Sequence, residues 1–338
     1  MMDELNRQRD MNTTISWFLS NKSTYLDEEG LWIVDMIAKN LCHLYRTQQK
    51  IDKVPVKHRI KINKIAIDDY ETEYLRPIIE LHDYAQLELK LYLVDFLIHG
   101  SMATHDYSLG WSDLDTYVVI KSDVFMDFNN LVRLRKLMQH AEHYLYKIDP
   151  LQHHGFIYAT EFDLSQYAPH CMPIEVLSCS CSLFKGVTYS IYSYRDYVKS
   201  SRYFEGRSEI LTLAAQENIL RHHAYKGKYL LENYGDLNTM YQMKYFLSSV
   251  MTLPVYYLDA IGEPCYKAES FDKMKEHIDF DCELEILHSA SEIRSQWSVY
   301  EKHPYQTNVI PEWLREKLGF DYFRRASELS TAMLRSIK

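Results

Sequence analysis

Several features are missing from this 338-residue sequence, and each absence narrows what the protein can be. No run of about 18 apolar residues is present, so we expect no transmembrane helix. The first residues, MMDELNRQRDMNTTISWF, lack the apolar core of a secretory signal. Repeats and low-complexity segments are also missing. The apolar fraction of 46% is ordinary for a globular protein, and the length suffices for two or three compact units.

The sequence also lacks cysteine pairs of the CxxC kind and an excess of positive charge. The six cysteines form no CxxC pair, and a chain of this length does not need disulfide bonds to fold. Reduced thiols and a cytoplasmic location are therefore expected. The net charge of -9 disfavours a general nucleic-acid binder, which would show a basic surface. A few local lysines are still enough to hold a small anion.

The hydrophobic patterns divide the chain into three regions. Residues 1–90 are predicted to be mainly helical, with a short extended connector near Ile60 and Ile62. Residues 91–187 predict an α/β unit: buried strands at LYLVDFLI, LDTYVVI, HHGFIYAT and MPIEVLSCS, and an amphipathic helix at FNNLVRLRKLMQHAEHYLY. Residues 188–338 are predicted to form a C-terminal helical domain. The expected fold class is therefore α+β.

Two aspartates, Asp113 and Asp115, stand at the start of the predicted strand that ends in TYVVI. Side chains two residues apart in a strand point to the same face, while Leu114 points into the core. Two adjacent carboxylates repel each other unless a cation neutralises them. Their hard oxygen atoms suit Mg²⁺ or Mn²⁺, which takes further ligands from water and phosphates.

A glycine and a serine precede this pair by about a dozen residues. Gly100 follows a buried strand and lets the backbone approach a ligand closely. Ser101 stands at the expected N-terminus of the next short helix, where backbone N–H groups and a hydroxyl suit a phosphate. Ser112, directly before Asp113, is a further candidate to line the phosphate site.

The joint pattern resembles a known signature. An apolar strand, Gly100-Ser101, a short spacer, Asp113-Leu114-Asp115 and a second apolar strand are similar to the motif of the nucleotidyltransferase superfamily related to DNA polymerase beta. The resemblance covers about residues 91–185. It implies a catalytic unit with a mixed sheet, flanked by N-terminal helices and a C-terminal helical domain. It also implies catalysis by Asp113 and Asp115, which would hold metal ions.

The resemblance further implies a third carboxylate on a later strand, acting as general base or metal ligand. Glu175 is the first choice, because it lies in the apolar stretch PIEVLSCS, where a charged side chain otherwise lacks a reason. Asp163 and Asp149 remain open alternatives. In the helical region, a lysine that contacts the triphosphate is plausible on the same resemblance. Lys267 is preferred because it follows a Gly-Pro turn, although an ordinary solvated lysine is the simpler interpretation.

The sequence therefore predicts a metal-dependent nucleotidyltransferase. It would move a nucleoside monophosphate from a nucleoside triphosphate such as ATP to a hydroxyl acceptor and release pyrophosphate. The acidic chain favours a small molecule or a protein as acceptor over a long nucleic acid, and no membrane partner is expected. The alternatives are an enzyme that modifies tRNA ends or antibiotics, and a degenerate module that binds nucleotides without catalysis. The acceptor, the base preference and the oligomeric state are not encoded in these patterns.

Overall fold

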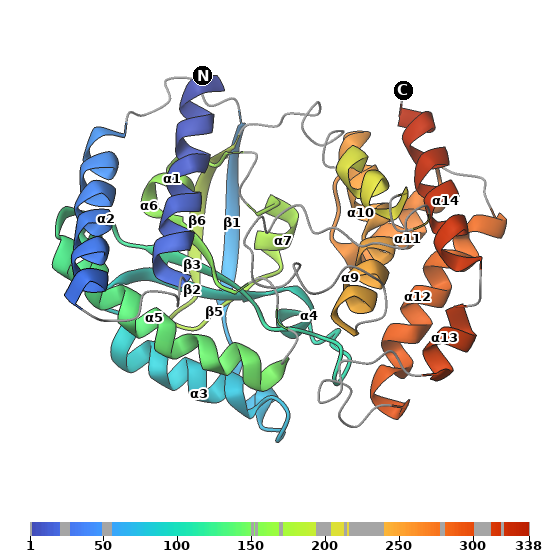
Figure 1. Ribbon diagram of the computed structural model, residues 1–338, viewed down its shortest axis with the longest axis horizontal. Helices are drawn as coiled ribbons and strands as arrows, with labels where there is room; N and C mark the ends of the chain where they lie inside the picture. The colour runs from blue at the N-terminus through green and yellow to red at the C-terminus, as the bar shows by residue number, and fades with distance from the viewer. Residues whose placement is uncertain are drawn as a thin grey trace. The chain divides into compact units, whose positions relative to one another are not determined.

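The structure is a computed structural model of an α+β protein (Figure 1). The chain divides into two compact units. The first comprises Met1–Tyr107 and Ser112–Arg195, and the second comprises Ser108–Trp111 and Asp196–Lys338. No helix in the described part is long and apolar enough to cross a membrane. The structure describes residues 2–20, 28–48, 56–149, 152, 155–168, 172–193, 204–212, 215, 240–277, 281–300, 312–318 and 321–337.

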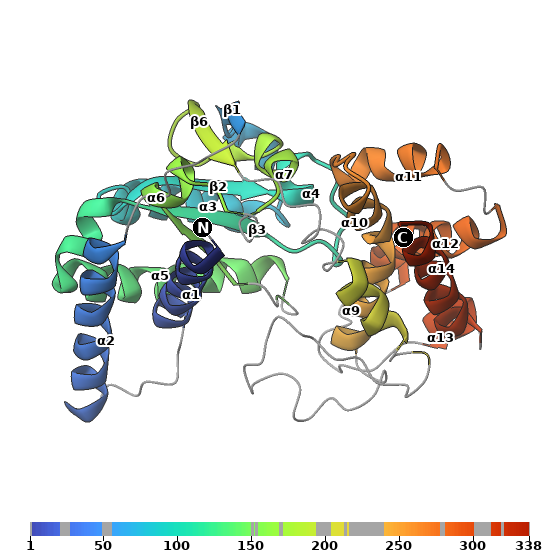
Figure 2. The same cartoon turned by 90° about the horizontal axis from the view of Figure 1, so that it is seen from above.

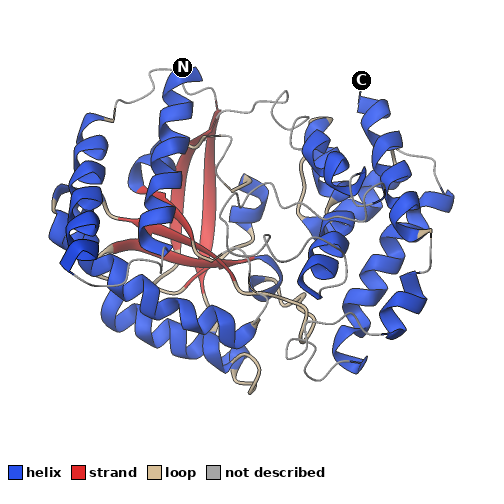
Figure 3. Cartoon of the chain, in the orientation of Figure 1, coloured by secondary structure: helices blue, strands red, loops and turns tan. Residues whose placement is uncertain are grey.

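A six-stranded mixed sheet organises the first unit (Figure 3). Its order is β4-β3-β2-β5-β1-β6. The β2–β3, β2–β5 and β1–β6 pairs are antiparallel, whereas β3–β4 and β1–β5 are parallel. The strands are β1 (Val56–Lys64), β2 (Leu93–His99), β3 (Asp115–Ile120), β4 (Ile157–Thr160), β5 (Cys181–Ser182) and β6 (Val187–Ser193).

Helices cover both faces of this sheet, and Figure 2 shows α5 and α7 on opposite sides of β2 and β3. One core joins Val118 and Ile120 to helices α1, α2, α3 and α5. The other joins Tyr117 and Val119 to α6 and α7. The helices are α1 (Met2–Ser20), α2 (Glu28–Thr47), α3 (Arg76–Tyr84), α4 (Gly100–Ala103), α5 (Phe128–Ile148), α6 (Glu161–Ser165) and α7 (Ile174–Ser178), with short helical segments η1 (Ile67–Tyr70), η2 (Ala85–Leu89) and η3 (Ser122–Met126).

The register of β2 against β3 defines two ends of the sheet. His99 pairs with Asp115 at one end, and Leu93 pairs with Ile120 at the other. We call these the Asp115 end and the Lys121 end, because Lys121 directly follows β3. Since β4 runs parallel to β3, its last residue, Thr160, also lies at the Lys121 end.

The second unit is helical in its described part. Residues 204–212 form a helix, and the indole rings of Trp111 and Trp297 pack edge to face with centroids 4.8 Å apart. The other helices are α9 (Met240–Met251), α10 (Leu253–Ala260), α11 (Lys267–Lys275), α12 (Asp281–Tyr300), α13 (Glu312–Leu318) and α14 (Tyr322–Ile337). Much of the long helical segment expected after Arg207 lies outside the described residues.

Strands β2 and β3 and helix α5 confirm the prediction for the centre of the α/β unit. The extended connector expected around Ile60 is strand β1, which belongs to the sheet. Two other expectations are wrong. Residues beyond 187 continue as strand β6, with Tyr189, Ile191 and Ser193 inward, because their alternation gives that strand one buried face. MPIEVLSCS holds helix α7 before the short strand β5 and is not one strand.

Candidate functional site

Asp113 and Asp115 lie where the sequence predicts them, at the entry to β3. Both side chains are partly exposed, whereas Leu114 between them is fully buried in the core shared with α5. Asp115 opens the strand two residues before Tyr117, so it shares a face with Tyr117 and Val119. The buried leucine therefore holds the segment in place, and both carboxylates remain partly exposed to solvent.

Gly100 makes a close approach to Asp115. Its φ is +67°, a left-handed backbone that side chains rarely adopt. A Cβ atom added at Gly100 would lie 2.3 Å from Oδ2 of Asp115, which is closer than a real contact allows. Two features therefore require glycine at this position: the left-handed backbone conformation and the Asp115 carboxylate beside it. The glycine and one aspartate of the signature, which are 15 positions apart, meet at the Asp115 end.

The residues around this meeting point are mostly buried. Ser101 follows Gly100 in the first turn of α4, and Ser112 precedes Asp113; both are shielded from solvent. The backbone carbonyl of Ser112 accepts a hydrogen bond from the Tyr74 hydroxyl at 3.1 Å. These two serines therefore belong to the same end of the sheet as the aspartates, as predicted.

Two further residues at this end were missed by sequence reasoning. His99 pairs with Asp115 across the two strands and is buried. Gln152 donates from Nε2 to the backbone carbonyl of Leu114 at 3.0 Å, which fixes the chain between the two aspartates. A signal for His99 existed, because the residue before Gly100 closes the buried strand. The sequence holds no such signal for Gln152, because its hydrogen bond reaches a residue 38 positions away in the chain.

The three candidates for a further carboxylate are separated by the topology. Glu175 lies on helix α7 and not on a strand, which corrects the expectation; α7 precedes β5, whose Cys181 pairs with Ile98, so Glu175 is at the Asp115 end. Asp149 follows α5, and its backbone carbonyl accepts a hydrogen bond from the Gln152 N–H at 3.0 Å. Because Gln152 also binds the carbonyl of Leu114, Asp149 is at the same end.

Asp163 is a different case, because it lies in α6 beyond Thr160, at the Lys121 end. It is fully buried, and its carboxylate accepts hydrogen bonds from Gln8, Asn12 and Thr160. Burial raises the pKa of this carboxyl above its ordinary value of 3.8. The topology removes Asp163 from the site and makes it a structural anchor.

A metal ion would find two carboxylates at the Asp115 end. Among the described residues, no three side chains of His, Cys, Asp or Glu are grouped to hold an ion. The Asp113–Asp115 pair supplies hard oxygen ligands, and Mg²⁺ commonly completes its shell with water and phosphate oxygens. The donor atoms of this pair are therefore of the kind that binds Mg²⁺.

Lys267 opens helix α11 in the second unit, and its carbonyl accepts a hydrogen bond from the Ser270 hydroxyl at 2.7 Å. Its role in binding a triphosphate stays a prediction. Comparison of the chain with protein-family models, with curated proteins and with solved structures finds no match to any of them.

Proposed function

We propose that this protein is a metal-dependent nucleotidyltransferase. The observation that carries the proposal is the approach of Asp115 to Gly100, because it brings the two halves of the signature together at one end of the sheet. Asp113, which is partly exposed and precedes Asp115 by two residues, adds the second carboxylate. Two like charges two residues apart in the chain have a clear chemical use if a cation binds there.

In the proposed reaction a nucleoside triphosphate binds at the Asp115 end. Asp113 and Asp115 would hold Mg²⁺ or Mn²⁺, which when bound neutralises phosphate charge. Gly100 and Ser101 would line the phosphates. The oxygen of an acceptor hydroxyl forms a bond to the α-phosphorus, the bond from that phosphorus to pyrophosphate breaks, and a carboxylate takes the hydroxyl proton. Glu175 and Asp149 are the two candidates for that base. A small molecule or a protein is the favoured acceptor.

The direct test replaces the aspartates one at a time. Asp113→Asn and Asp115→Asn are expected to lower pyrophosphate release by about a hundredfold or more, since charge stabilisation of this kind contributes on that scale. Both should also abolish the rise in melting temperature that a triphosphate gives with Mg²⁺. Asp83→Asn, an exposed aspartate on α3, is the matched control and should change neither.

The outcomes separate the alternatives. Stabilisation by a triphosphate without pyrophosphate release from any acceptor would favour a nucleotide-binding module. No stabilisation by any triphosphate, with Mg²⁺ present and the chain folded, would overturn the proposal. Comparing Glu175→Gln with Asp149→Asn then assigns the base, because only the variant at the true base should lose activity while keeping the triphosphate-dependent stabilisation.

A further inference from the structure

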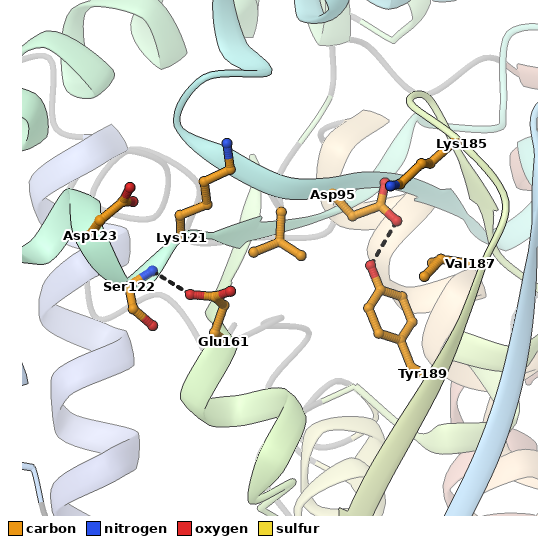
Figure 4. Close-up of a pocket in the computed structure, with 9 residues that line it drawn as sticks. Asp95, Lys121, Ser122, Asp123, Glu161, Lys185, Val187 and Tyr189 are labelled. Atoms are coloured by element: carbon orange, nitrogen blue, oxygen red, sulfur yellow. Dashed lines mark hydrogen bonds between the residues drawn. The ribbon is translucent and has the colours of Figure 1, made fainter.

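A second site candidate lies at the opposite end of the same sheet. A pocket of about 550 Å³ opens at the Lys121 end, within the first unit (Figure 4). That volume is within the range of small-molecule sites. Its lining comes from the start of β2, the residues that directly follow β3 and β4, the turn before β6, and β6 itself: Val94, Asp95, Lys121, Ser122, Asp123, Glu161, Lys185, Val187 and Tyr189.

One lining carboxylate, Asp95, is already used by the fold. It is buried and accepts hydrogen bonds from the Ser182 hydroxyl at 2.5 Å and the Tyr189 hydroxyl at 2.7 Å. The backbone N–H of Phe96 gives a third, at 2.9 Å. Burial raises the pKa of Asp95. These bonds tie β2 to β5 and β6, so Asp95 forms part of the pocket wall.

The Lys121 side chain also makes hydrogen bonds within the protein. Its ammonium group donates to the backbone carbonyls of Lys90 and Leu91, at 3.0 and 2.9 Å. In Figure 4 the Lys121 side chain runs away from Ser122 and Glu161. Its charge is therefore held at the rim by backbone oxygens.

The remaining charged groups form two separate poles. Asp123 is exposed and makes no ion pair among the described residues, and Glu161 uses one oxygen, Oε2, to accept from the Ser122 backbone at 2.6 Å. Lys185 is exposed, and its positive charge acts on the nearby Asp95 carboxyl, although the two are not close enough to form an ion pair. Figure 4 shows Asp123 and Glu161 on one side of the pocket and Lys185, drawn beside Asp95, on the other.

The strand order sets the distance between these poles. Glu161 follows β4 and Lys185 follows β5, and three strand spacings separate β4 from β5 in the order β4-β3-β2-β5. At about 4.8 Å for each spacing, the two backbones are roughly 14 Å apart. Side chains reaching inward shorten that gap, and Val94 on the intervening strand β2 supplies an apolar surface between them.

We propose that this pocket binds an elongated zwitterion, with an ammonium group at Asp123 and Glu161, a carboxylate at Lys185, and a saturated chain between them. Such a ligand satisfies both poles at once and covers apolar surface without burying an unpaired charge. The site lies at the other end of the strands that carry the aspartate pair, so the ligand is not a reactant of nucleotidyl transfer. The inference stands without the proposed function.

The test is calorimetric titration of the full chain with ε-aminocaproate, without nucleotide or metal. Hexylamine, caproate and glycine are the matched probes: they carry the cation alone, the anion alone, and both charges without a spacer. We expect ε-aminocaproate to bind at least about tenfold more tightly than each of them, since a hydrogen-bonded charge contributes on that scale. Free L-lysine and a short acetylated peptide ending in lysine distinguish a metabolite from a chain terminus as the source of this chemistry.

Two variants and two controls locate the site. Lys185→Gln and Glu161→Gln should each weaken ε-aminocaproate binding about tenfold, whereas Lys61→Gln and Glu73→Gln, exposed outside the pocket, should not. Asp113→Asn should bind it normally, which separates this inference from the proposed function. Circular dichroism checks that each variant folds. Absence of binding at millimolar concentration, equal binding of caproate, or unchanged binding by both pocket variants would overturn the proposal.

Discussion

Gly100 and Gly155 share a left-handed backbone but differ in their surroundings. Their φ angles are +67° and +63°. A Cβ at Gly100 would collide with the Asp115 carboxylate, whereas a Cβ at Gly155 would meet nothing within 4 Å. Substitution of Gly155 therefore tests backbone strain alone. Substitution of Gly100 tests the same strain together with displacement of the Asp115 carboxylate.

Alanine at each position gives a prediction. Gly155→Ala should lower the free energy of unfolding by about 1–2 kcal/mol, the cost of a left-handed alanine. Gly100→Ala should cost more and should also remove the Mg²⁺-dependent stabilisation by a triphosphate, because Asp115 must move. Urea unfolding and thermal melts measure the two effects. Equal loss of the nucleotide response in both variants would show that the close approach does not matter for binding.

At the scale of elements, helix α1 is attached to α6 through one buried carboxylate. Gln8 on α1 donates from Nε2 to Oδ1 of Asp163 at 2.6 Å and to the carbonyl of Gln166 at 3.0 Å. Asn12, one turn later, donates to the same Oδ1 at 3.1 Å. On the other side, Oδ2 of Asp163 accepts from the backbone and hydroxyl of Thr160, which completes a capping box at the start of α6.

Gln8→Ala should lower the free energy of unfolding by about 1–3 kcal/mol at neutral pH, the cost of a lost bond to a buried charged group. Burial already raises the pKa of Asp163 above 3.8, and the Gln8 bond opposes that rise. The contribution of this group to stability is present below pH 3.8 and is lost as pH rises through the folded pKa. Removing Gln8 raises that pKa further, so the penalty should shrink toward acid pH.

Urea unfolding at several pH values measures this effect, with hydrogen exchange in α1 as a second readout. Thr13→Ala is the matched control, since that exposed hydroxyl donates to the carbonyl of Arg9 on its own helix. A penalty for Gln8→Ala that stays constant from acid to neutral pH would contradict the proposed electrostatic role of Asp163.

Elements with strong local signals could be predicted from the sequence. Strand β2 is an apolar run interrupted by Asp95, and α5 has helical periodicity and an N-cap at Asp127, which accepts a hydrogen bond from the Asn129 N–H at 2.8 Å. Strand β1 alternates charged and apolar residues and acquires its partner, β6, from beyond residue 187. Such distant pairing leaves no local trace. The five apolar-rich residues of α7 fit either a strand or a helix, and only packing decided between them.

The residues of the candidate site also differ in how far the sequence alone could predict them. Gly100, Asp113 and Asp115 form a short-range pattern that could be read directly from the sequence, and the structure brings Gly100 and Asp115 together. The choice among Glu175, Asp163 and Asp149 depended on which end of the sheet each one reaches. That is a property of strand direction, which the sequence does not display, and it separates Asp163 from the other two.

At the scale of the whole molecule, the second unit includes four residues, 108–111, taken from the middle of the first. Trp111 is buried and contacts Trp297, which in turn packs edge to face with Trp313 at 6.1 Å. The chain returns to the first unit at Ser112, directly before the aspartate pair.

Trp111→Ala should therefore destabilise the second unit by about 3–5 kcal/mol, the usual cost of removing a buried large aromatic side chain. Hydrogen exchange followed by mass spectrometry should show faster exchange in α12, which carries Trp297. Trp17→Ala on α1 is the control, because that indole is 49% exposed. Faster exchange confined to the first unit would contradict the assignment of Trp111.

The chain leaves the first unit at residue 108 and returns to it at residue 112, which limits how the two units can be exchanged by gene fusion. A gene fusion that exchanges everything after residue 195 would replace the helices that receive Trp111 but keep Trp111 itself. The incoming helices would need a matching aromatic partner, or the tryptophan would be left exposed next to Asp113. The two units are therefore not interchangeable modules, and substitutions at Trp111 and Trp297 should be inherited together.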